Sequence, residues 1–214
     1  MTFADRHDAG RQLAEKLNHY AGNPDCLIAA IPRGGVVLGY ELAKKLKLPL
    51  DVIVTKKIGA PGNPEYAIGS IDTDGNVAFD NDVLTALGIT PGDLKVEIAD
   101  LQEQAREKER MMREGRAVQQ VKGKTVILVD DGIATGYTMQ AAIQSLRANS
   151  AAKVVVAVPV SSIDAAKRLR KIVDEFVVLD TPDQFMSVGQ FYESFDQTTY
   201  PEAKKLMDEA NGAS

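Results

Sequence analysis

Short apolar runs alternate with amphipathic stretches along most of this chain. The runs at 26–31, 125–129 and 153–158 are rich in apolar and β-branched residues, which is typical of strands buried on both faces of a parallel sheet. Stretches with helical spacing of apolar residues separate them. We expect helices at about 5–20, 36–46, 81–87, 93–119, 137–148 and 163–172, and strands at 26–31, 51–57, 67–71, 76–79, 125–129, 153–158 and 176–179. The alternation predicts an α/β fold with a central parallel sheet flanked by helices.

One segment interrupts the alternation. The strands at 67–71 and 76–79 are expected to form a hairpin through Asp74-Gly75, a favoured tight-turn dipeptide. The charged helix at 93–119 follows, and its irregular apolar positions favour packing along the domain, or a dimer contact, over a coiled coil. We therefore expect a single domain over residues 1–214, with a core at about 22–180 and a hairpin and long-helix insertion; a homodimer is one possibility.

Composition and charge narrow the functional classes. The 214 residues are 44% hydrophobic and 26% charged, with a net charge of −5 and no basic block, so nucleic acid is not an expected partner. No apolar run approaches the ~20 residues that span a bilayer, and the first residues lack the apolar segment of a signal peptide. The single cysteine, Cys26, heads an apolar strand and is read as a small core residue, with a reactive thiol as the alternative. A cytoplasmic location is expected.

The segment from Thr125 to Thr138 carries the clearest chemistry. A β-favouring run ends in Asp130 and Asp131, and a small-residue loop and a helical pattern follow. Backbone N–H groups at a helix N-terminus favour a phosphate, and two carboxylates suit vicinal hydroxyls or a divalent cation. The combination predicts a site for a ribose 5-phosphate. The alternative is an ordinary strand-to-helix turn in which Asp131 or Thr135 caps the helix.

This string resembles the phosphoribosyl pyrophosphate (PRPP) loop of type I phosphoribosyltransferases. The resemblance implies that Asp130 and Asp131 face the ribose hydroxyls. It also implies that the following segment wraps the 5-phosphate: Gly132, Ile133, Ala134, Thr135, Gly136, Tyr137 and Thr138. The chain is closest to the predicted phosphoribosyltransferases whose acceptor is not assigned.

Two further loops resemble the same family. In Ile31-Pro32-Arg33-Gly34-Gly35, the glycines let backbone N–H groups approach an oxyanion and Arg33 adds donors. The loop is similar in position and composition to the family's pyrophosphate loop. Lys56 and Lys57 end the next strand and point to opposite faces, so at most one aims at the site directly, and surface lysines are the alternative. Both are candidate pyrophosphate ligands, and the expected catalytic set is Asp130, Asp131, Arg33 and Lys57. The glycines and prolines at 59–64 would suit a lid.

The tail at about 181–200 resembles the base-binding hood of hypoxanthine-guanine phosphoribosyltransferases. That resemblance implies that Phe185 stacks on the acceptor and that Met186 or Ser187 offers backbone groups. It also implies that Glu193 lies near a metal, together with Asp130 and Asp131. Core packing of Phe185, Phe191 and Tyr192 is the alternative. Two departures matter: Ala134 stands where that subfamily has its aspartate general base, and Val158–Ser162 lacks its purine-reading lysine. No hypoxanthine or guanine substrate is therefore assigned.

The expected function is Mg²⁺-dependent transfer of the 5-phosphoribosyl group of PRPP to a nitrogenous base, with release of pyrophosphate. The alternative is a non-catalytic PRPP-binding regulatory or interaction protein of the same fold. His7 and His19 lie far in sequence from the loops, so histidine general-base catalysis is not expected.

Overall fold

A five-stranded parallel sheet forms the centre of the molecule. The computed structural model describes residues 1–113 and 115–212, without the side chain of Glu65. The sheet has the order β2-β1-β6-β7-β8, and each neighbouring pair is parallel. Its strands are β1 (Cys26–Ala30), β2 (Leu50–Val52), β6 (Thr125–Val129), β7 (Lys153–Val160) and β8 (Glu175–Asp180). Because β1 and β6 are neighbours and Ala30 pairs with Val129, the loops after them lie side by side at the carboxyl edge.

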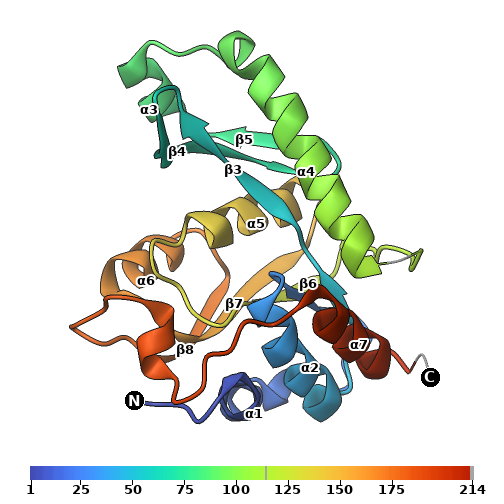
Figure 1. Cartoon of the computed structure of the whole chain (residues 1–214). Helices are drawn as coiled ribbons and strands as arrows, with labels where there is room; N and C mark the ends of the chain where they lie inside the picture. The colour runs from blue at the N-terminus through green and yellow to red at the C-terminus, as the bar shows by residue number, and fades with distance from the viewer. Residues whose placement is uncertain (114, 213–214) are drawn as a thin grey trace.

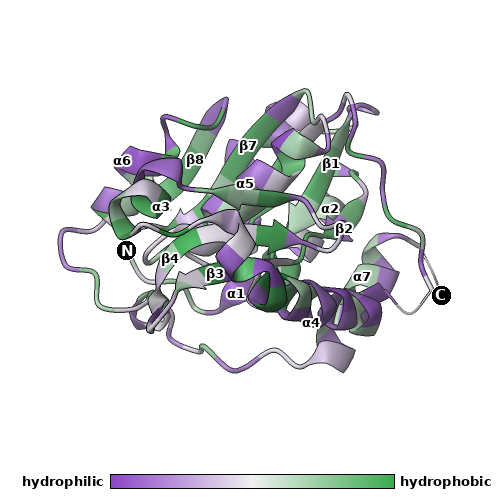
Figure 2. Ribbon diagram, turned by 90° about the horizontal axis from the view of Figure 1, so that it is seen from above, coloured by the Kyte–Doolittle hydropathy of each residue, from purple (hydrophilic) through white to green (hydrophobic). Residues whose placement is uncertain are grey.

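Helices cover both faces of this sheet. On one face lie α1 (Arg6–Lys16), α2 (Gly34–Leu46) and α7 (Tyr200–Ala210); on the other lie α5 (Tyr137–Ala148) and α6 (Ile163–Leu169) (Figure 1). Alternate residues of one strand enter the two cores, as Ile28 and Leu27 of β1 do. Figure 2 shows the hydrophobic central strands among more polar helices. The predicted fold class is confirmed.

A second, antiparallel sheet stands above α5, with strands β3 (Thr55–Ala60), β4 (Asn63–Asp72) and β5 (Val77–Phe79) (Figure 1). It is followed by α3 (Asn81–Leu87), a 3₁₀ turn at Pro91–Leu94 and the long helix α4 (Lys95–Arg113). Its separate small core is Ile58, Ala60, Ile68, Ile71, Leu84 and Leu94. The expected hairpin through Asp74-Gly75 is present, and Gly75 has a φ of 91° that favours glycine.

The expected single strand at 51–57 is two strands in different sheets. Val52 is the last residue of β2 to pair with β1, whereas Thr55 pairs with Asp72 of β4. The chain changes sheets because β4 provides β3 with an antiparallel partner. The segment at 59–64, which would suit a lid, is the end of β3, a tight turn and the start of β4, and its role as a lid stays a prediction.

Two helix boundaries also differ from expectation. The long helix ends at Arg113 rather than near residue 119. At this end of the helix, Arg113 forms an ion pair with the buried Asp51 of β2. The tail, expected to be loop-rich, ends in α7, which packs on α2 and α4. A capping box between Thr199 and Glu202 starts α7. Among the described residues, no helix has the length and apolar character needed to cross a bilayer.

Candidate active site

The two carboxylates after β6 are the centre of the site. The backbone N–H of Asp131 donates to Asp130 Oδ1 at 2.8 Å. Arg6 Nε, from α1, donates to Asp131 Oδ2 at 2.8 Å, and the Tyr192 hydroxyl donates to the Asp131 carbonyl oxygen at 2.6 Å. The Arg6 and Asp131 side chains are only 11% and 16% exposed. The N-terminal helix and the tail therefore fix Asp131 from two sides.

Burial controls the ionisation of this pair. Burial, and then the charge of Asp131, raise the pKa of Asp130 well above its usual range. Burial also raises the pKa of Asp131, although Arg6 opposes that shift. A ligand that supplies positive charge or hydroxyl donors would stabilise the ionised pair, as a divalent cation or a ribose diol does.

The loop after Asp131 forms a hollow at the start of α5. Its outer side is tied to the next strand, since the Ile133 N–H donates to the Val160 carbonyl at 2.9 Å and the Ser162 hydroxyl donates to the Ala134 carbonyl at 2.7 Å. Gly136, with a φ of 78°, precedes the first turn of α5. The inner side lines a cavity of about 170 Å³, bounded by Asp130, Gly132, Ile133, Ala134, Thr135, Gly136, Thr138, Met139 and Val188. The predicted 5-phosphate segment thus surrounds a cavity at a helix N-terminus.

The glycines after β1 have a different structural reason from the one expected. Gly34 and Gly35 are the first residues of α2, and the Gly35 N–H donates to the Ile31 carbonyl at 3.1 Å rather than pointing at a ligand. A Cβ on Gly34 would lie 2.1 Å from Asp131 Oδ2, and one on Gly35 would lie 2.8 Å from the Val129 carbonyl. Both glycines are needed because the start of α2 packs directly against the carboxylate pair.

The cations of the site come from several elements. The Arg33 guanidinium lies 5.0 Å from the Tyr200 ring centroid of α7. Lys56 Nζ donates to Gln104 Oε1 of α4 at 3.0 Å. Lys57 pairs across the sheet with Ser70, whose hydroxyl donates to Gln144 of α5. These contacts place Lys56 on the α4 face of β3 and Lys57, opposite Ser70, on the α5 face, in line with the alternation of side chains along a strand.

The expected base-binding residues of the tail lie in different surroundings. Phe185 packs against the sheet core, with its ring centroid 5.2 Å from that of Phe191, and Met186 is 91% exposed. Ser187 starts a 3₁₀ turn by a capping box with Gln190. Phe191 and Tyr192 are buried core residues. The role of Phe185, Met186 and Ser187 in binding a base stays a prediction.

Glu193 is exposed, and its backbone N–H donates to the Phe3 carbonyl at 2.8 Å. Within residues 1–113 and 115–212, no three His, Cys, Asp or Glu side chains are grouped closely enough to hold a metal ion by themselves. Mg²⁺ usually takes one or two carboxylates and completes its shell with substrate oxygens and water. Asp130 and Asp131 fit that requirement, so Glu193 as a third ligand stays a prediction.

Two site residues were missed from the sequence. Arg6 carries no local signal, because it contacts Asp131 across 125 positions. Lys108 of α4 donates to the Pro32 carbonyl at 3.3 Å, beside the start of α2. Its signal was available: it lies between Ala105 and Met112 on the apolar face of the long helix.

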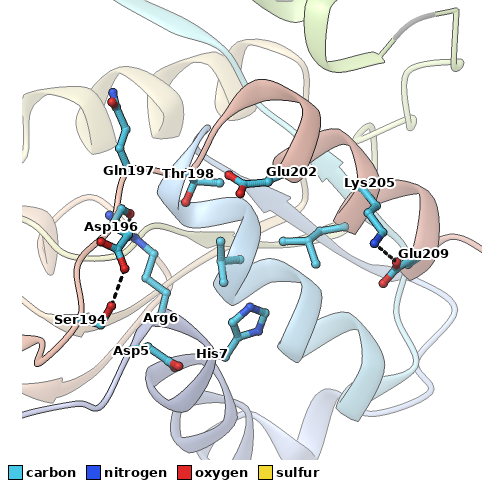
Figure 3. A pocket seen from close by; sticks show the side chains of 12 residues that line it. Asp5, Arg6, His7, Ser194, Asp196, Gln197, Thr198, Glu202, Lys205 and Glu209 are labelled. Carbon is cyan, nitrogen blue, oxygen red and sulfur yellow. Dashed lines mark hydrogen bonds and ion pairs between the residues drawn. The ribbon is translucent and has the colours of Figure 1, made fainter.

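A second cavity shares Arg6 with the carboxylate pair. It has a volume of about 440 Å³ and is bounded by the start of α1, Val37 of α2, the segment 194–198 and α7 (Figure 3). The Arg6 guanidinium lies 3.8 Å from the Phe195 ring centroid, and Arg6 also donates to the Asp196 carbonyl at 2.6 Å. Arg6 therefore forms a wall between this cavity and Asp131.

The fold agrees with the comparisons to known proteins. The chain matches the model of the phosphoribosyl transferase domain over residues 4–194, and it belongs to that family. It is 42% identical over 210 residues, 98% of the chain, to "Putative phosphoribosyl transferase Rv0571c" of Mycobacterium tuberculosis. The chain spans about half, 47%, of the length of that relative.

The chain is also similar to a solved structure and, over a shorter stretch, to a second curated protein. The crystal structure of TT1426 from Thermus thermophilus superposes with a TM-score of 0.88 at 37% identity, covering 98% of this chain and 99% of the other. A stretch of 63 residues is 49% identical to ribose-phosphate pyrophosphokinase of Pyrococcus furiosus, covering 28% of this chain and 23% of that protein.

Proposed function

We propose that this chain transfers the 5-phosphoribosyl group of PRPP to a nitrogenous base and releases pyrophosphate. The observation that carries the proposal is the adjacency of the Asp130–Asp131 pair to the hollow at the start of α5. A diol site and a phosphate site in one loop match the ribose 5-phosphate half of PRPP. Family membership and the name of the pyrophosphokinase relative support the same ligand.

The chain's residues would act mainly by positioning and by managing charge. Asp130 and Asp131 would hold the ribose hydroxyls and place negative charge beside C1 as its bond to pyrophosphate breaks. The segment 132–138 would hold the 5-phosphate. Asp130 and Asp131 would hold Mg²⁺, and that ion would supply positive charge that favours departure of the pyrophosphate. Ala134 cannot accept a proton, so the acceptor would need to lose its proton to another group or to water.

Titration calorimetry of PRPP, with and without Mg²⁺, tests the site. We expect magnesium-dependent binding by the wild-type chain and its loss in the Asp130→Asn/Asp131→Asn double variant. Asp183→Asn, in the exposed tail, is the matched control and should bind like wild type. Pyrophosphate release from PRPP across a panel of nucleobases then tests turnover. Binding without release for every base would support the non-catalytic alternative, and no binding would refute the PRPP site.

A further inference from the structure

Lys108 occupies a position on α4 where an apolar side chain is expected. The face of α4 that packs on the protein runs through Leu101, Ala105 and Met112, and the last two are fully buried. Lys108 lies one turn after Ala105 and one turn before Met112, so it points inward. Burying an ammonium group is unfavourable without a compensating partner. Its hydrogen bond to the Pro32 carbonyl, at 3.3 Å, is a long one.

The surroundings of Lys108 are themselves cationic. Burial and the charges of Lys56 and Arg33 lower the pKa of Lys108, while Asp130 raises it. These three cations come from β3, the β1–α2 turn and α4. Two printed contacts bring the elements together: Lys56 donates to Gln104 of α4, and Lys108 donates to the carbonyl of Pro32, the residue before Arg33. The positive charges of these side chains repel one another, which is unfavourable. An anion bound among them would replace this repulsion with attraction.

The position of Lys108 is set by the anchor at the end of α4. Arg113 forms an ion pair with Asp51 and donates to the Val52 carbonyl at 3.1 Å, and both partners are buried in β2. Glu109 accepts from Arg113 Nε at 3.0 Å. This anchor fixes the rotation of α4 about its axis, so Lys108 is directed at the β1–α2 turn.

We infer that Lys108 of the long helix, together with Arg33 and Lys56, binds the pyrophosphate group of PRPP. The inference rests on the proposed function for the identity of the ligand, and on the contacts of Lys108 and Lys56 for the place of the anion. It gives the hairpin and long-helix insertion a direct role: α4 supplies a pyrophosphate ligand from outside the parallel-sheet core. Arg33 and Lys56 were expected from the sequence, whereas Lys108 was not.

Separate titrations of inorganic pyrophosphate and of ribose 5-phosphate, both with Mg²⁺, test this inference. Lys108→Met should weaken pyrophosphate binding about 10- to 100-fold, the usual range for losing a charge-assisted hydrogen bond, and should leave ribose 5-phosphate binding within about twofold. Lys108→Arg keeps the charge and should restore most of the pyrophosphate affinity. Lys95→Met, at the exposed start of α4, is the matched control and should bind both ligands like wild type.

Three results would overturn the inference. They are no pyrophosphate binding by the wild-type chain, equal binding by Lys108→Met, or a parallel loss of both ligands, which would mark a purely structural role. The outcome is separate from that of the proposed function. If pyrophosphate binds through Lys108 but no base is turned over, the transferase proposal is refuted and the anion site stands. If a base is turned over and Lys108→Met binds pyrophosphate as tightly as wild type, the transferase proposal stands and the anion site at Lys108 is refuted.

Discussion

The two sheets of the molecule contribute different charges to the candidate site: the three-stranded sheet brings a cation, whereas the loops of the parallel sheet carry both carboxylates together with Arg33. The parallel sheet is buried on both faces, and the loop after β6 carries Asp130 and Asp131. The three-stranded sheet has a small core of its own, and all of β5 and half of β3 are only partly buried. That sheet and α4 bring Lys56 and Lys108. A sheet buried on both faces can hold the carboxylates in fixed positions. The smaller unit formed by the three-stranded sheet and α4 has fewer buried contacts, so it can change its distance from the carboxylates at a lower cost in free energy.

The largest effect is expected where the parallel-sheet loops touch. Gly34→Ala would place a methyl group on the Asp131 carboxylate, because its Cβ would lie 2.1 Å from Oδ2 and 2.8 Å from Cγ. We expect a loss of about 1–3 kcal/mol in the free energy of unfolding and a loss of PRPP affinity of about 10- to 100-fold. Urea denaturation and titration calorimetry measure the two effects.

Gly92→Ala is the matched control for this substitution in the smaller unit. A Cβ there has ordinary spacing, with its nearest neighbour 3.5 Å away, so it should change unfolding by less than about 0.5 kcal/mol. If Gly34→Ala folded and bound PRPP as the wild-type chain does, the close approach between α2 and the carboxylate pair would not matter for the site.

A smaller effect should appear in the pH dependence of stability. The pKa of Asp130 is raised in the folded chain, so between its unfolded and folded values the native state binds more protons than the unfolded state. Stability contributed by this group is therefore present below the unfolded pKa and is lost as pH rises through the folded pKa. The Asp130→Asn variant cannot ionise at this position, so it does not lose stability as pH rises. It should be more stable than wild type at neutral pH by about 1 kcal/mol in the free energy of unfolding.

Urea denaturation of wild type and Asp130→Asn from acidic to neutral pH measures this difference, which should shrink at the acid end. Asp183→Asn, exposed in the tail, should follow the wild-type curve at every pH. Two results would contradict a raised pKa for Asp130 in the folded chain. They are a difference in the free energy of unfolding between wild type and Asp130→Asn that does not change with pH, and an Asp130→Asn variant that is less stable than wild type at neutral pH. Binding of PRPP with Mg²⁺ should instead strengthen as pH rises, because Mg²⁺ requires the ionised form of the Asp130–Asp131 pair.

The sequence was most informative where one contiguous segment carries both structure and chemistry. The strand, the two acids and the loop from Thr125 to Thr138 were predicted in place, because a buried run ending in polar residues has few alternatives. Arg6 and Lys108 could not be placed in the same way. Their contacts with Asp131 and Pro32 depend on how α1 and α4 pack against the sheet. Arg6 carries no local pattern, whereas the place of Lys108 on the apolar face of α4 indicated that it points inward but not what it contacts.

Two boundaries were missed for more local reasons. The run at 51–57 contains no glycine or proline to mark a break, so its sequence could not indicate that β3 would leave β2 for β4. The start of α7 did carry a signal, since Thr199 and Glu202 have the spacing of a capping box and Pro201 suits a first helical turn.

The smallest expected effect separates the two lysines of β3. Lys56 shares the α4 face with Gln104, whereas Lys57 lies on the face toward α5. If the cations of the three-stranded sheet act together with Lys108, Lys56→Met should weaken pyrophosphate binding about three- to tenfold, as expected for a partly exposed charge. Lys57→Met is its matched neighbour and should stay within about twofold. The reverse ranking would restore Lys57 as the catalytic lysine that the sequence suggested. It would also mean that β3 reaches the ligand through its α5 face, so that the cations of β3 and α4 act at different points of the site.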